Sequence, residues 1–280
     1  MSGKDADPKA CSARRAVEDA AGRVEGRPGR RYWPPVTTVR LDIEYDGTGF
    51  RGWARQPGRR TVQGVLEAGL AQILREEILL TVAGRTDTGV HALGQVASFD
   101  TEAALPSDLA RNLNGVTPGD VAVRRAEVVA DGFSARRDAR SRSYLYRVET
   151  SQAASPFERG RALWFPHRVD RAALAACAAA LPGNHDFTAF TPTQTDHVRF
   201  DRDVLAASWR EESDRILAFR ITADAFMRSM VRALVGTMLE VASSRRTVEN
   251  FSMLLEGATR SDAGDTAPPH GLYLESVGYD

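Results

Sequence analysis

Alternating and clustered apolar residues predict a regular order of strands and helices in the first half of the chain. Four segments have the pattern of strands with a buried face, namely Val39–Tyr45, Ile78–Val82, Gln95–Phe99 and Val121–Val129. Apolar residues at helical spacing follow Thr61, which can cap a helix, and a second helix is predicted over Pro106–Leu113. The resulting order is βαββαβ, which is typical of ferredoxin-like folds.

A similar order is predicted for the second half. The predicted strands are Ser141–Glu149, Asp203–Glu211, Ile216–Thr222 and Leu272–Tyr279. The predicted helices are Asp170–Leu181, Ala225–Ala242 and Thr247–Glu256. We therefore expect an α+β protein in which two similar ferredoxin-like βαββαβ units share a mostly antiparallel sheet.

The chain is predicted to have three parts. Residues 1–36 carry charges, Gly and Pro without an apolar period, which favours a disordered polar extension. Residues 37–140 are expected to form an N-terminal catalytic unit and residues 141–280 a C-terminal unit. No run of about 18 apolar residues and no signal-peptide pattern is present, so the sequence predicts a cytoplasmic protein.

The charge balance is neutral, with 37 basic and 37 acidic residues. This balance counts mildly against a nucleic-acid partner, because nucleic-acid-binding domains are usually basic. Arginines nevertheless cluster locally, in Arg51, Arg55, Arg59 and Arg60 and in Arg136, Arg137, Arg140, Arg142 and Arg147. Lys occurs only at positions 4 and 9, so many of these arginines are equally explained as ordinary surface charge. Cys11 and Cys177 show neither a pairing pattern nor metal-ligand spacing.

The segment Ala83–Ala92 concentrates the candidate chemistry, because Asp87 lies among small, polar and basic residues between Gly84 and Gly89. Glycines permit backbone angles that other residues resist, so a sharp loop can present this carboxylate between two strands. An ordinary hairpin connection explains the pattern equally well. An aspartic protease fits poorly, because that mechanism needs two such carboxylates and the chain has a single Asp-Thr-Gly. The third interpretation is an ionised carboxylate that acts as a nucleophile.

Two other segments carry candidate site residues. In the strand Ser141–Glu149, the period of two places Arg142 and Tyr144 on one face, where cross-strand packing is the plainer explanation. In the helix predicted over Ala225–Ala242, Arg228 and Arg232 share a face with small residues, so another group can come close to them. Asp46–Gly52 matches Gly-x-Gly-x-x-Gly formally, but the preceding strand has a polar face and no helix follows, unlike a dinucleotide-binding fold.

The motif Gly-Arg-Thr-Asp-x-Gly-Val-His-Ala around Asp87 resembles the signature of the TruA-type tRNA pseudouridine synthases. Three further segments resemble blocks of the same family in the same order, so that the resemblance covers roughly residues 38–280: the Tyr-Asp-Gly-Thr segment that begins at Tyr45, the strand that holds Tyr144, and the Met-Val-Arg segment that ends at Arg232. Ala54 and Leu145 depart from this pattern, since Gln and Arg are usual there.

The resemblance implies roles for individual residues. Asp87 is expected to be the catalytic aspartate, Arg232 its ion-pair partner, and Tyr144 the tyrosine that touches the target uracil and helps to remove the C5 proton. Arg85 is expected to fill the space that a flipped base leaves in the stem. His91, from the same motif, and Arg142, beside Tyr144, are further expected substrate contacts.

The implied reaction is the isomerisation of uridine to pseudouridine at positions 38 to 40 of the tRNA anticodon arm, by a cytoplasmic homodimer without cofactor or metal. Two other function classes remain open from the sequence. One is a non-catalytic RNA-binding module that uses the same basic grooves. The other is a nicotinamide-dependent oxidoreductase built on the glycines at 47 to 52, which the sequence disfavours.

Overall fold

Strands and helices of the first half follow the predicted order. The computed structural model describes residues 36–195 and 198–279. Its first elements are β1 (Thr37–Tyr45), α1 (Val62–Leu74), β2 (Thr81–Val82), β3 (His91–Thr101), α2 (Leu109–Val116) and β4 (Val121–Val128). Thr61 caps α1 as expected, because its side-chain oxygen accepts a hydrogen bond from the backbone N–H of Gly64.

The second half contains more strands than the sequence predicted. Its elements are β5 (Ser141–Glu149), β6 (Leu163–Trp164), α3 (Arg171–Ala179), β7 (Gly183–Asp186), β8 (Asp201–Ser213), β9 (Ile216–Ala223), α4 (Met230–Ala242), α5 (Val248–Met253) and β10 (Leu272–Gly278). The short strands β6 and β7 lack the alternation that identifies a strand in a sequence.

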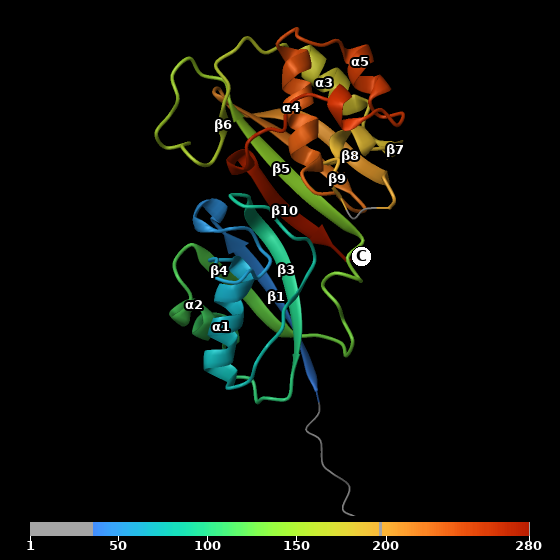
Figure 1. Cartoon of the computed structure of the whole chain (residues 1–280). Helices are drawn as coiled ribbons and strands as arrows, with labels where there is room; N and C mark the ends of the chain where they lie inside the picture. The colour runs from blue at the N-terminus through green and yellow to red at the C-terminus, as the bar shows by residue number, and fades with distance from the viewer. Residues whose placement is uncertain (1–35, 196–197, 280) are drawn as a thin grey trace, which may run out of the picture. The chain divides into compact units, whose positions relative to one another are not determined.

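One sheet joins both halves (Figure 1), in the order β4-β1-β3-β10-β5-β9-β8-β7, with β2 and β6 paired to β3 and β5. The last strand of the chain, β10, lies in the middle, where it pairs in parallel with β3 and antiparallel with β5. The other long pairs are antiparallel. The predicted fold class, two ferredoxin-like units that share a mostly antiparallel sheet, is confirmed.

The main core lies on one face of the sheet, where residues of all the larger helices pack against strands of both halves. In β5 the buried residues Tyr144, Tyr146 and Val148 point to this face. Leu145 points to the opposite face, where it forms a small cluster with Ala218 and Tyr273. The sheet therefore has a helix-covered face and an open face, and adjacent residues of one strand are divided between them.

Two predicted elements differ from the structure. Of the strand predicted over Ile78–Val82, only Thr81–Val82 pairs with β3. The helix predicted from Ala225 begins five residues later, at Met230, because Ser229 has a left-handed backbone with φ of 60°. A left-handed residue interrupts a right-handed helix, so Arg228 and Arg232 do not share a helix face.

The predicted boundary between the two units falls between β4 and β5, and the division at residue 140 stays a prediction. The predicted extension over residues 1–36 lies outside the described residues, apart from Val36. No helix among residues 36–195 and 198–279 is long and apolar enough to cross a membrane.

Candidate active site

Asp87 lies in a tight turn that leads into β3. The backbone N–H of Val90 donates to the carbonyl oxygen of Asp87 at 3.1 Å. Gly89 is left-handed, with φ of 77°, and a Cβ there would come within 3.1 Å of Pro269, so the turn needs glycine at this position. Gly84, which was expected to share this role, is not left-handed and instead lies beneath the hydroxyl of Tyr144.

Buried hydrogen bonds hold the turn from below. The hydroxyl groups of Thr86 and Tyr45 lie 2.7 Å apart, and the amide of Gln95 donates to the carbonyl oxygen of Gly84 at 2.7 Å. Burial raises the pKa of Tyr45 to about 12, so its phenol stays neutral. Because all these groups are satisfied inside the protein, Gly84 and Thr86, which precede Asp87, are held in place.

A loop after β1 supports the same turn. The backbone N–H of Trp53 donates to the carbonyl oxygen of Thr86 at 3.0 Å. Gly52 is left-handed, and a Cβ at this position would lie only 2.8 Å from that oxygen. The glycines that formally resembled a dinucleotide-binding motif therefore allow two backbone segments to approach behind Asp87.

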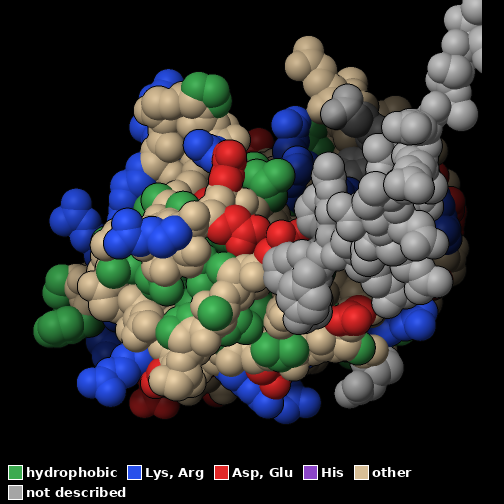
Figure 2. Space-filling model, turned by 90° about the horizontal axis from the view of Figure 1, so that it is seen from below, with side chains coloured by type: hydrophobic (Ala, Val, Ile, Leu, Met, Phe, Trp, Pro, Cys, Tyr) green, Lys and Arg blue, Asp and Glu red, His purple; other side chains and the backbone are tan. Residues whose placement is uncertain are grey.

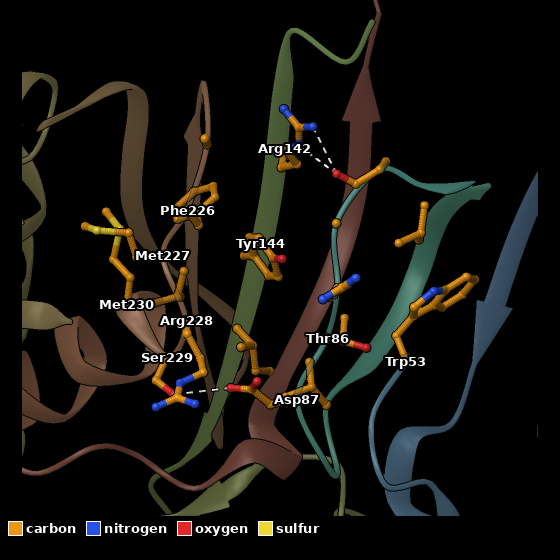
Figure 3. Close-up of a pocket in the computed structure, with 18 of the residues that line it drawn as sticks. Trp53, Thr86, Asp87, Arg142, Tyr144, Phe226, Met227, Arg228, Ser229 and Met230 are labelled. Carbon is orange, nitrogen blue, oxygen red and sulfur yellow. Dashed lines mark hydrogen bonds between the residues drawn. The ribbon is translucent and has the colours of Figure 1, made fainter. Parts of the chain in front are cut away.

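Two groups from the second half reach the Asp87 carboxylate. The Ser229 hydroxyl donates to Oδ2 at 3.2 Å (Figure 3). Nη1 of Arg232 lies 3.7 Å from the same oxygen. The arginine therefore acts through its charge, whereas the serine forms the hydrogen bond. The Arg232 side chain is 18% exposed and that of Asp87 is 37% exposed, so the carboxylate can still be reached from outside.

The segment before β10 fixes the position of Arg232. Nε of Arg232 donates to the carbonyl oxygen of Ala267 at 2.7 Å, and the N–H of Ala267 donates to the carbonyl oxygen of Arg232. This segment touches α4 at Gly236, where a Cβ would lie 1.8 Å from the carbonyl oxygen of Asp265. Burial lowers the pKa of Arg232 and the Asp87 charge opposes that effect, so the guanidinium stays protonated.

Tyr144 lies in the floor of the same pocket. Its ring meets Phe226 edge to face, with 4.9 Å between the ring centroids, and its side chain is nearly buried. Burial, then the neighbouring Tyr45 and Asp87, raise the pKa of Tyr144. The phenol therefore stays protonated at neutral pH, where it can pack against a ring or donate a hydrogen bond but cannot act as a phenolate base.

Arg142 has a different environment from the one expected. Its five N–H groups donate to four backbone carbonyl oxygens, those of Ala83, Arg136, Ala139 and Asp224, at 2.9 to 3.3 Å. An arginine has five such donors in all. Arg142 thus ties the start of the Asp87 loop to the second half with all five donors, and its expected contact with a substrate stays a prediction.

Arg85 and His91 point to different sides of the sheet. Arg85 is exposed and lines the Asp87 pocket, as expected for a substrate contact. His91 is buried away from this pocket, and its Nδ1 accepts a hydrogen bond from the N–H of Gly47 at 3.1 Å. Its ring stacks on Tyr273, with 4.6 Å between the centroids. The expected substrate contact of His91 is therefore not seen, because the structure does not bring its ring to Asp87.

The Asp87 pocket has a volume of about 1170 Å³, larger than most small-molecule sites. Asp87 is the one carboxylate among its described lining residues, beside several arginines: Arg85, Arg136, Arg142, Arg202 and Arg228. None of these arginines forms an ion pair with a carboxylate within residues 36–195 and 198–279. In the view of Figure 2, by contrast, basic and acidic side chains are interspersed over the face. A basic pocket with one acid suits a polyanionic substrate and nucleophilic chemistry.

Sequence reasoning missed Ser229, which the structure brings to Asp87. Ser229 appeared only as a small neighbour of the arginines, since nothing in the sequence predicts its left-handed backbone. Gly236 was expected to let another group approach, and that group is the chain's own segment from Asp265 to Ala267. No cluster of three side chains suited to a metal ion occurs in the described part of the chain.

Comparison with known proteins identifies the family. The model of the tRNA pseudouridine synthase family matches residues 43–136 and 177–280, which include both Asp87 and Arg232. The chain is 40% identical over 266 residues to tRNA pseudouridine synthase A of Gloeobacter violaceus, covering 94% of this chain and 84% of that protein. It is 43% identical over 247 residues to tRNA pseudouridine synthase A of Frankia casuarinae, covering 87% and 90% of the two chains.

Fold and matches together define a pseudouridine synthase, which is an isomerase. More particularly, the chain belongs to the tRNA pseudouridine synthase family. Among solved structures, a chain of a Cbf5-Nop10-Gar1 complex is 11% identical with a TM-score of 0.31, covering 72% of this chain and 54% of that one, and is too distant to add to the argument.

Proposed function

We propose that the protein converts uridine to pseudouridine at positions 38 to 40 of the tRNA anticodon stem-loop, with Asp87 as the nucleophile. The observation that carries the proposal is the Asp87 carboxylate itself, the single acid in a basic pocket, with Arg232 and Ser229 at one of its oxygens. The relatives named tRNA pseudouridine synthase A support the choice of substrate.

The proposed reaction needs one nucleophile and no net oxidation. The C1′–N1 bond of uridine breaks, the uracil turns, and C5 bonds to C1′. The C5 proton is lost and N1 gains a proton, so the atoms balance. Asp87 forms a transient bond, either to C6 of the uracil or to C1′ of the ribose, which splits one difficult step into easier ones. Arg232 stabilises the charged form of the carboxylate before attack.

A uridine within a stem has to leave the helix to reach Asp87. Flipping a nucleotide out of its stack costs a few kcal/mol. Contacts between phosphates and the exposed arginines of the pocket, Arg85, Arg136 and Arg228, would offset this cost. Arg85, which is exposed and two residues from Asp87, would fill the vacated stack. Tyr144 would pack against the uracil ring beside Phe226.

The family resemblance also implies a cellular location and an oligomeric state. We propose a cytoplasmic homodimer, because two clefts grip an elbow-shaped tRNA better than one. Gel filtration with light scattering measures the assembly directly, and a monomeric mass would contradict this part alone.

The test is incubation of the purified protein with an unmodified tRNA transcript, followed by mapping of pseudouridines. We expect new pseudouridine at one or more of positions 38 to 40. Asp87→Asn should lower the rate by about 10³-fold or more while tRNA binding is largely kept, because removing a nucleophile abolishes the covalent route. Asp131→Asn is the matched control, since Asp131 is exposed and does not line the pocket. Equal activity of Asp87→Asn and wild type would overturn the proposal.

The rival function is an RNA-binding module without turnover, and the same basic pocket accounts for it equally well. Release of tritium from 5-tritiated uridine in tRNA separates the two, because only the isomerisation frees that label. Binding without release would favour the module.

A further inference from the structure

We propose that Ser229 is a positioning residue that decides which oxygen of Asp87 attacks. Both partners of the carboxylate, the Ser229 hydroxyl and the Arg232 guanidinium, meet Oδ2. Among the described residues, the one side-chain hydrogen bond to this carboxylate goes to Oδ2, so Oδ1 is the oxygen left for substrate. This inference rests on the proposed function of Asp87 as nucleophile.

Ser229 fixes the orientation of the Asp87 carboxylate, whereas Arg232 supplies a positive charge beside it. At 3.2 Å the Ser229 hydroxyl is within hydrogen-bond distance of Oδ2, whereas at 3.7 Å the Arg232 nitrogen is beyond it. A charge alone constrains the rotation of a carboxylate weakly, while a hydrogen bond fixes the plane of the group. Because attack requires close alignment of the reacting atoms, the hydroxyl contributes to the rate through geometry.

The backbone of Ser229 is held in an uncommon conformation. Its φ of 60° is left-handed, which residues with a Cβ seldom adopt outside turns and functional sites. Two backbone hydrogen bonds fix the segment, from Met230 N–H to the Met227 oxygen and from Ala233 N–H to the Ser229 oxygen. The hydroxyl makes no cap for α4, although Ser is a favoured capping residue. It donates to Asp87 instead.

A second serine with a left-handed backbone, Ser244, lies beyond the other end of α4 and serves as a comparison for Ser229. Ser244 follows the C-terminal end of α4 with φ of 61° and is exposed. Left-handed residues are common at this end of a helix, because they satisfy its last carbonyl groups. At Ser229 the left-handed residue precedes the helix, where this explanation does not apply. Ser244 is therefore a matched control with the same residue type and backbone.

The test compares Ser229→Ala, Ser229→Gly and Ser229→Asn in single-turnover assays with tRNA. Ala and Gly should each lower kcat roughly 10-fold, the effect of one hydrogen bond to a charged group, with KM unchanged. Asn accepts left-handed angles and carries a donor, so it should restore part of kcat.

Stability distinguishes positioning from folding. Glycine accepts the left-handed backbone without strain, so Ser229→Gly should unfold at the same denaturant concentration as wild type or higher. If the serine only supported the fold, Ser229→Gly would keep its activity and Ser229→Ala alone would lose it. That result would overturn the proposal. Ser244→Ala and Ser244→Gly should leave kcat unchanged.

The outcomes separate this inference from the proposed function. If Ser229→Ala has the kcat of wild type while Asp87→Asn is inactive, the role of Ser229 is wrong and the nucleophile stands. If Asp87→Asn remains active, the proposed function fails, whatever the Ser229 variants do.

Discussion

The two faces of the central sheet carry opposite charge arrangements. On the helix-covered face, the Asp87 pocket contains one carboxylate and several arginines without carboxylate partners among the described residues. On the open face, a second cavity of about 520 Å³ is lined by Glu44, Asp46, Asp120 and Glu212. Three of these acids pair with arginines, namely Arg124, Arg60 and Arg147, and Asp46 lies beside His91. A neutral total charge therefore does not exclude a locally basic pocket.

Residues that are neighbours in the sequence lie on opposite faces of the sheet. Tyr144 and Leu272 line the Asp87 pocket, whereas Leu145 and Tyr273, their neighbours in sequence, line the open-face cavity. The motif around Asp87 is divided similarly, since His91 lines the second cavity. The residues of one continuous motif therefore do not all belong to one site, because a strand sends alternate side chains to opposite faces.

Among the variants that compare the two faces, the largest fall in kcat is expected for Arg232→Gln. Arg232→Gln removes the charge near Asp87 and the contact with Ala267, so kcat should fall roughly 100-fold, as for a small misplacement of a reacting group. Arg220→Gln, which removes an arginine paired with Glu275 on the open face, is the matched control and should keep kcat. Equal losses in the two variants would mean that the faces do not differ in function.

The next largest effect is expected at Gly236, where α4 packs against the backbone of Asp265. Gly236→Ala places a Cβ against the Asp265 backbone, so we expect a loss of stability of about 1–3 kcal/mol together with reduced kcat. Gly115→Ala in α2 is the control, because nothing lies within 4 Å of a Cβ there and alanine favours a helix. Urea unfolding of both variants measures the difference, and a fully stable Gly236→Ala would contradict the close approach.

Salt dependence of tRNA binding measures the charge difference more finely. If Arg85 and Arg228 contact phosphates, Arg85→Ala and Arg228→Ala should each reduce the slope of log K against log salt concentration by about 1. Arg161→Ala removes an exposed arginine that lines the open-face cavity, and its slope should equal that of wild type. A change of slope for Arg161→Ala alone would place the RNA on the open face.

The smallest effect is expected for His91 and concerns stability. Burial lowers the pKa of His91, so the folded protein binds a proton there less readily than the unfolded chain. The contribution of the neutral ring is complete above the unfolded pKa of about 6.5 and is lost as the pH falls below it. His91→Asn keeps an acceptor near the Gly47 N–H without a titratable ring.

Urea midpoints at about pH 5.5 and about pH 7.5 give the comparison. Wild type should lose more stability between them than His91→Asn. Identical losses would show that another group, such as His270, whose pKa burial also lowers, causes the effect.

Much of the architecture could be predicted from local patterns. Period-two alternation identified β1, β4 and β5 almost to the residue, and helical spacing with the Thr61 cap identified α1. These signals are local. Each strand or helix buries one side, so apolar residues recur along the chain at the spacing of that side. The pairing of Asp87 with Arg232 came from resemblance to a family, since 145 positions separate residues that no local pattern connects.

The sequence by itself determined the order of the longer elements, the fold class and the turn that carries Asp87. Only the tertiary structure decided that His91 turns away, that backbone carbonyl groups occupy every donor of Arg142, and that Ser229 contacts Asp87. The physical reason is the range of the interactions. Periodicity and turn residues act within a few positions, whereas the direction of a side chain depends on which distant carbonyl, ring or carboxylate the packed sheet brings beside it.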